Sequence, residues 1–114
     1  MNGNDFKIEV ENLKEQIVNK FNPQEIVLFG SLAKGIFRSN SDIDICIIKD
    51  TCNKRELITE IYTEVDSRVP YDIVLYTSEE WEQYKNDKNT FAYSIINTGV
   101  KIYGWYIKIC KLDR

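Results

Sequence analysis

The amino-acid sequence predicts an α/β (α+β) fold, in which helices pack on one side of a small mixed β-sheet. Short apolar runs rich in β-branched residues, typical of strands, alternate with longer segments whose apolar residues recur at helical spacing. The chain of 114 residues has the length of one compact domain, and no linker, repeat or low-complexity segment divides it. We therefore expect residues 1–114 to form a single domain.

The first part of the chain is predicted to contain a long helix, a short helix and two strands. Apolar residues at helical spacing predict a helix over about residues 5–21, which ends at Asn22-Pro23. The apolar run 25–29 predicts a buried strand, and a short helix is expected over about residues 31–35. A polar loop then leads to a second strand over residues 42–48.

The middle of the chain continues the alternation of helix and strand. An apolar face predicts a helix over about residues 53–66, and Pro70 precedes a third strand over residues 71–76. Thr77 and Glu80 have the spacing of a capping box, which predicts that a helix starts at about residue 78 and runs to about residue 86.

The last part of the chain is predicted to hold one more helix and one or two strands. A helix is expected over about residues 91–98, with Gly99 at the position that follows its last turn. Residues 100–103 then form a fourth strand, and the alternation of residues in the segment 105–109 is typical of one further strand.

Composition excludes several classes of function. The chain has a net charge of −3 and no block of basic residues, so nucleic acid is an unlikely partner on electrostatic grounds. It contains no histidine, which excludes a Ser-His-Asp triad, and its three cysteines lack the spacing of a zinc site. No apolar run is long enough to span a membrane, and the odd cysteine count without a signal peptide predicts a cytoplasmic protein.

Three carboxylates form the first half of a candidate site. Asp42 and Asp44 are two apart on a predicted strand, so both project from the same face, with Cα atoms roughly 6.5–7 Å apart. Each raises the pKa of the other unless a cation intervenes, and oxygen donors without histidine or cysteine favour Mg²⁺ or Mn²⁺. Asp72 lies near the start of the next strand, as Asp42 and Asp44 do on theirs.

The turn Gly30-Ser31 forms the second half of this site. Gly30 permits close approach of the backbone, and the N–H groups from Ser31 onward begin a helix, an arrangement that binds phosphate. The turn and the three acids can meet only in a mixed sheet. The first strand must run antiparallel to the second, and the third must run parallel to the second through a helical crossover. Such a site suits in-line displacement at phosphorus.

These residues carry a resemblance to a known family. Gly30-Ser31, followed after ten residues by Asp42-Ile43-Asp44, resembles the signature of the minimal nucleotidyltransferases in the DNA polymerase beta superfamily. The sequence motifs of that family are similar to three segments of this chain, L-F-G-S-x-A-K-G, S-D-I-D and the closing G-V-K-I-Y-G. The resemblance extends to about Gly104. The tail from Trp105 has no counterpart in it.

The resemblance implies a fold, an activity and a role for each residue of the site. The fold would be the nucleotidyltransferase fold, similar to the palm of DNA polymerase beta. Asp42 and Asp44 would hold two Mg²⁺ ions, and Asp72 would complete the catalytic metal site and help to activate the acceptor hydroxyl. Gly30 and Ser31 would bind the triphosphate of ATP, from which AMP is transferred.

The resemblance also implies a partner. Small stand-alone members of the family resemble antitoxins of toxin–antitoxin pairs whose toxin is a HEPN ribonuclease, and relatives that modify small molecules carry a second domain. We therefore expect an antitoxin that adenylylates a tyrosine of a HEPN-type toxin.

Several alternatives remain open at this stage. The protein could neutralise a partner by docking alone, or modify a small molecule in a pocket completed across a homodimer. Ser31 could be only an N-cap, and Ser41 could be a turn residue or a hydrogen-bond donor to the acids. Lys34 and Arg38 could contact phosphates or remain solvated. No segment indicates which base the nucleotide carries.

Overall fold

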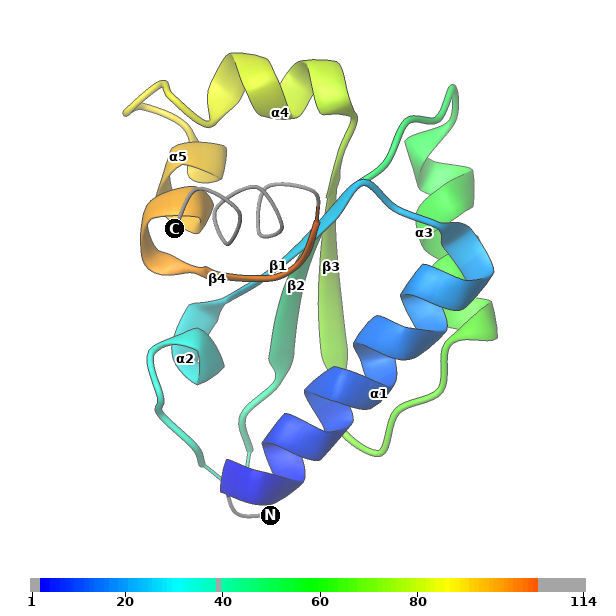
Figure 1. Cartoon of the computed structure of the whole chain (residues 1–114), viewed down its shortest axis with the longest axis vertical. Coiled ribbons are helices and arrows are strands. Elements are labelled where there is room, and N and C mark those ends of the chain that lie inside the picture. Colours follow the sequence, from blue (N-terminus) through cyan, green and yellow to red (C-terminus); the bar gives the residue numbers. More distant parts are fainter. Residues whose placement is uncertain (1–2, 39, 105–114) are drawn as a thin grey trace, which may run out of the picture.

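The computed structural model describes residues 3–38 and 40–104, and these form one four-stranded sheet with five helices (Figure 1). In chain order the elements are α1 (Gly3–Phe21), β1 (Glu25–Phe29), α2 (Gly30–Ala33), β2 (Ile43–Ile48), α3 (Lys54–Glu64), β3 (Tyr71–Tyr76), α4 (Ser78–Tyr84), α5 (Phe91–Thr98) and β4 (Val100–Gly104). The predicted strand 105–109 lies outside the described residues. No helix in the described part of the chain is long and apolar enough to cross a membrane.

The sheet is mixed, with the strands in the order β3-β2-β1-β4. β1 runs antiparallel to β2 and to β4, whereas β2 and β3 are parallel. The connection between the parallel strands contains α3, as a crossover requires. Both strand directions that a shared site requires are therefore confirmed.

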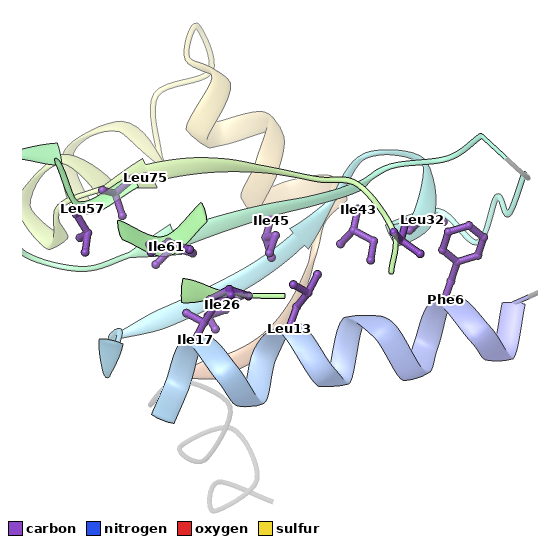
Figure 2. Close-up of a cluster of buried hydrophobic side chains, with 13 residues drawn as sticks. Phe6, Leu13, Ile17, Ile26, Leu32, Ile43, Ile45, Leu57, Ile61 and Leu75 are labelled. Carbon is purple, nitrogen blue, oxygen red and sulfur yellow. The ribbon is translucent and has the colours of Figure 1, made fainter. Parts of the chain in front are cut away.

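Helices cover both faces of this sheet, which differs from the expected packing on one side. α1 and α3 lie against one face, where Leu13 and Ile17 of α1 point toward Ile26 and Ile45 (Figure 2). On the other face, buried residues of β1 and β2 pack against Trp81 of α4 and the buried side of α5. The alternation of strand side chains makes this possible, since both sets of alternate residues on β2 are apolar beyond Asp44.

A buried carboxylate on α1 holds the loop that leads into β3. Glu9 is 4% exposed and accepts hydrogen bonds from Arg68 Nε (2.8 Å), the Arg68 backbone N–H (3.1 Å) and the Ser67 hydroxyl (3.2 Å). Burial raises the pKa of Glu9, but the hydrogen bonds from Arg68 and Ser67 and the charge of Arg68 outweigh it and lower the pKa. The position of the first residues of β3 therefore depends on α1.

Local signals placed most element boundaries correctly, including the capping box of Thr77 and Glu80, which is fully formed. Gly99 is different, because it ends α5 with φ −87° rather than in the left-handed conformation expected after a helix. A Cβ atom on Gly99 would lie 2.5 Å from the carbonyl oxygen of Ile95 and 2.7 Å from that of Leu28. Glycine is thus required there for space between α5 and β1.

Candidate active site

The three candidate carboxylates lie at the starts of two adjacent parallel strands. Asp44 of β2 is directly opposite Asp72 of β3 in the register, and Phe29 of β1 is opposite Asp44 on the other side. Asp42 precedes the first residue of β2 rather than lying within the strand as predicted. Asp44 is half-buried, whereas Asp42 and Asp72 are exposed.

Asp44 experiences the charges of both other acids. Burial raises the pKa of Asp44, and the negative charges of Asp72 and then of Asp42 raise it further. The structure therefore places both Asp42 and Asp72 close enough to Asp44 for their charges to act on it. A cation bound between them would relieve this repulsion.

Gly30 connects β1 to α2 directly beside Asp44. Its φ of +77° is in the left-handed region, and a Cβ atom built on it would lie 2.3 Å from the Asp44 Oδ2 atom. The sequence predicted a close approach of the backbone to a phosphate at this residue. The structure adds a second requirement, since the carboxylate of Asp44 occupies the space that a side chain at position 30 would fill.

Ser31 lies inside α2 and does not cap it. The N-cap residue is Phe29, whose side chain makes no capping hydrogen bond. The interpretation of Ser31 as only an N-cap is therefore not supported, and Ser31 lines a surface hollow together with two of the acids.

This hollow has a volume of about 410 Å³. Besides Ser31 it is lined by Asp42, Asp44, Ile36, Arg38, Asn40 and Ser41. Asp72 does not line the hollow. The hollow therefore brings together Ser31 and the two carboxylates near the start of β2, Asp42 and Asp44.

Among the described residues, Arg38 is the one cation that lines the hollow, and sequence reasoning left its role open. The turn that carries it is closed by two hydrogen bonds, from the Arg38 N–H to the Ser41 hydroxyl (3.1 Å) and from the Ser41 N–H to the Arg38 carbonyl (3.0 Å). Ser41 is thus the turn residue that one of the two interpretations expected. Asn40 and Ile36 were missed, because nothing in a polar loop indicates which residues face a site.

The hollow contains two carboxylates but, in the described part of the chain, no closed set of metal ligands. Within the described residues, no three His, Cys, Asp or Glu side chains converge to enclose a metal ion. Mg²⁺ is commonly held by one or two carboxylates, with substrate phosphates and water as the remaining ligands. Asp42 and Asp44 supply two such carboxylates, and a bound cation would offset the burial and the charges of Asp72 and Asp42 that raise the pKa of Asp44.

Comparison with known families identifies the domain. The family described as Polymerase beta, Nucleotidyltransferase matches residues 11–105. The chain belongs to this family. It is therefore a nucleotidyltransferase, and the matched range includes Gly30, Ser31 and all three acids. No curated protein is significantly similar to it in sequence.

Two solved structures share the fold of this nucleotidyltransferase. A candidate nucleotidyltransferase from Sulfolobus solfataricus is 20% identical, with a TM-score of 0.54 and coverage of 93% of this chain and 91% of that chain. A chain from a crystal structure of a toxin–antitoxin with AMP-PNP is 24% identical, with a TM-score of 0.50 and coverage of 95% of this chain and 77% of that chain. At such identities the likeness concerns the fold.

Proposed function

We propose that this nucleotidyltransferase transfers AMP from ATP to a tyrosine hydroxyl of a HEPN-type toxin and thereby acts as an antitoxin. The observation that carries the proposal is the order of groups across three neighbouring strands. Gly30-Ser31 follows β1, Asp42 and Asp44 lie at the start of β2, and Asp72 lies at the start of β3. A structure of similar fold belongs to a toxin–antitoxin with AMP-PNP, which supports the choice of nucleotide and partner.

Each group has a separate task in this proposal. The Gly30-Ser31 turn binds the β- and γ-phosphates, and Arg38, which also lines the hollow, offsets their charge. Asp42 and Asp44 would hold two Mg²⁺ ions, and Asp72 would contribute to the one next to the acceptor. The chemistry that bound Mg²⁺ supplies is neutralisation of phosphate charge and activation of the attacking oxygen.

The order of the strands matches the order in which the leaving group, the phosphorus and the attacking oxygen must lie in the proposed reaction. Because β2 lies between β1 and β3, the phosphate turn and Asp72 are on opposite sides of Asp44. In-line displacement requires the same order of leaving group, phosphorus and attacking oxygen. The bond between the tyrosine oxygen and the α-phosphorus forms as the bond to pyrophosphate breaks, and Asp72 accepts the proton of the hydroxyl.

The proposal is tested with purified protein, ATP, Mg²⁺ and the product of the neighbouring gene, which the proposal expects to be the toxin. We expect mass spectrometry to detect one or more AMP groups on a toxin tyrosine, and Asp42→Asn to abolish the transfer. Asp87→Asn is the matched control, because Asp87 is an exposed acid outside the hollow that accepts a local hydrogen bond from the Asn89 N–H. Unmodified toxin, or equal transfer by Asp42→Asn, would contradict the proposal. Inhibition of the toxin without ATP would indicate docking alone.

A further inference from the structure

The loop between α2 and β2 places successive residues in two different hollows. Ile36 and Arg38 line the hollow that contains Asp42 and Asp44. The residue between them, Phe37, lines a second hollow of about 280 Å³, which is mainly apolar and borders α1. The loop therefore connects the candidate active site to the first helix of the chain.

The ring of Phe37 is held by the first turns of α1. It stacks on the ring of Phe6, with centroids 6.0 Å apart and planes at 24°. A Cβ atom built on Gly3 would lie 3.2 Å from the Phe37 ring, so the backbone of α1 also packs against it. Phe6 is only 1% exposed and lies beside Leu32 in the buried cluster (Figure 2). Phe37 is thus anchored to the hydrophobic core although it lies in a surface loop.

Hydrogen bonds fix the start of the loop and its turn, and the aromatic contact adds a link to a distant part of the chain. The Ile36 N–H donates to the Ser31 carbonyl oxygen (3.0 Å), which ties the start of the loop to α2. The two hydrogen bonds between Arg38 and Ser41 close the turn itself. The stacking of Phe37 on Phe6 then links the residue directly before Arg38 to α1.

We infer that Phe37 is a positioning residue for nucleotide binding, which holds Arg38 in the hollow where its guanidinium meets the triphosphate. The inference rests on the proposed function, which places the phosphates beside Arg38. An arginine on a loose loop must be ordered when the nucleotide binds, and this ordering lowers affinity. Because the contact with Phe6 orders the loop when the protein folds, Arg38 is already in place. Phe37 acts through Arg38 and does not itself touch the nucleotide.

The experiment is a double-mutant cycle on nucleotide affinity. Calorimetric titration uses Mg²⁺ and the α,β-methylene analogue of ATP, which cannot release pyrophosphate. Arg38→Ala should raise the Kd of the analogue about tenfold or more, because it removes a charge-assisted hydrogen bond. Phe37→Ala should raise the Kd about three- to tenfold when Arg38 is present. In the Arg38→Ala background, the same change should raise the Kd less than about twofold, since the two residues act as one unit.

Two further variants separate positioning from general packing. Phe37→Tyr keeps the ring and should retain most of the affinity. Ile8→Ala truncates another exposed apolar side chain of α1, one that lines neither hollow, and should leave the Kd unchanged. Thermal unfolding of every variant shows that the protein titrated is folded.

Each other result has a defined meaning. An unchanged Kd in Phe37→Ala or in Arg38→Ala, or an equal loss from Phe37→Ala in both backgrounds, would overturn the inference. The expected coupling without any AMP on the product of the neighbouring gene would leave the inference standing and contradict the acceptor in the proposed function. A folded wild-type protein that does not bind the analogue would contradict the proposed function itself.

Discussion

The two faces of β2 serve different purposes although their residues alternate along one strand. Ile43, Ile45 and Ile47 face α1 and α3, and each is at most 1% exposed. On the opposite face Asp44 is half-buried at the open end of the strand, whereas Cys46 and Ile48 lie under α4 and α5. One face is therefore packed along its whole length, and the other is packed only as far as the candidate site begins.

On this face of β2, the change from open to packed occurs between Asp44 and Cys46. Phe29, opposite Asp44, makes an edge-to-face contact with Phe91 at the start of α5, with ring centroids 5.6 Å apart. Beyond it, burial raises the pKa of the Cys46 thiol, so this thiol stays protonated and unreactive. Asp44 and Cys46 point to the same face, and the cover provided by α4 and α5 decides which of them reaches solvent.

The largest expected effect separates activity from stability at the open end. Asp44→Asn removes a proposed metal ligand and should lower the rate of AMP transfer roughly 10²–10³-fold. The same change removes a half-buried charge that Asp72 and Asp42 repel, so thermal stability should stay constant or rise. Parallel measurements of pyrophosphate release and thermal unfolding check this. A clear loss of stability would show that Asp44 is a structural residue.

A substitution on the packed face of β2 should lower stability and leave nucleotide binding unchanged. Ile45→Ala leaves a cavity between the sheet and α1, and should lower the free energy of unfolding by about 2–5 kcal/mol. Nucleotide affinity of the fraction that remains folded should not change. Urea denaturation and calorimetric titration with ATP test the two parts. Ile8→Ala, at an isoleucine of α1 that is 59% exposed, is the control and should cost far less.

A substitution at Gly30 should affect both the packed region and the candidate site, because Gly30 lies beside Asp44. Gly30→Ala places a Cβ atom against the Asp44 carboxylate and in a left-handed conformation, so both stability and transfer should fall. Gly35→Ala is a matched control, because Gly35 has φ +79° but a Cβ atom there would meet no other atom within 4 Å. It should lose only the conformational cost of about 1–2 kcal/mol, with normal transfer by the folded protein. Equal effects of both changes on transfer would exclude the contact with Asp44 as the cause.

The smallest effect concerns Glu9, the buried carboxylate of α1. Its lowered pKa means that its stabilising contribution is present above the ordinary glutamate pKa of about 4.3 and is lost as the pH falls through the lowered value. Glu9→Gln should therefore cost about 1–2 kcal/mol at pH 7, and less at pH 3. Denaturation at several pH values measures the difference. Glu11→Gln, in an exposed pair with Lys14, should cost little at any pH.

Local patterns in the sequence carried much of the prediction. The bounds of β1 and β3 follow from apolar runs flanked by Pro23, Gly30 and Pro70, and these signals act within a few residues of the chain. The mixed sheet followed from a chemical condition, since Gly30-Ser31 and three acids can meet only with one antiparallel and one parallel pairing. Their roles in catalysis remain predictions.

Other features depend on contacts between distant segments, which no local pattern encodes. The sequence predicted helices over about residues 78–86 and 91–98, but not that they cover the face of the sheet that carries the acids. The contact of Gly30 with Asp44 and the hydrogen bond from Ile73 to Tyr62 each join residues from different elements.

The sequence by itself thus determined which residues form strands and helices and which acids could share a site, because periodicity and turn chemistry are local. The tertiary structure decided that Asp44 lies partly buried against Gly30 and that Asp72 does not line the hollow. These arrangements arise from how helices pack across the sheet, and that packing depends on the shape of the whole core.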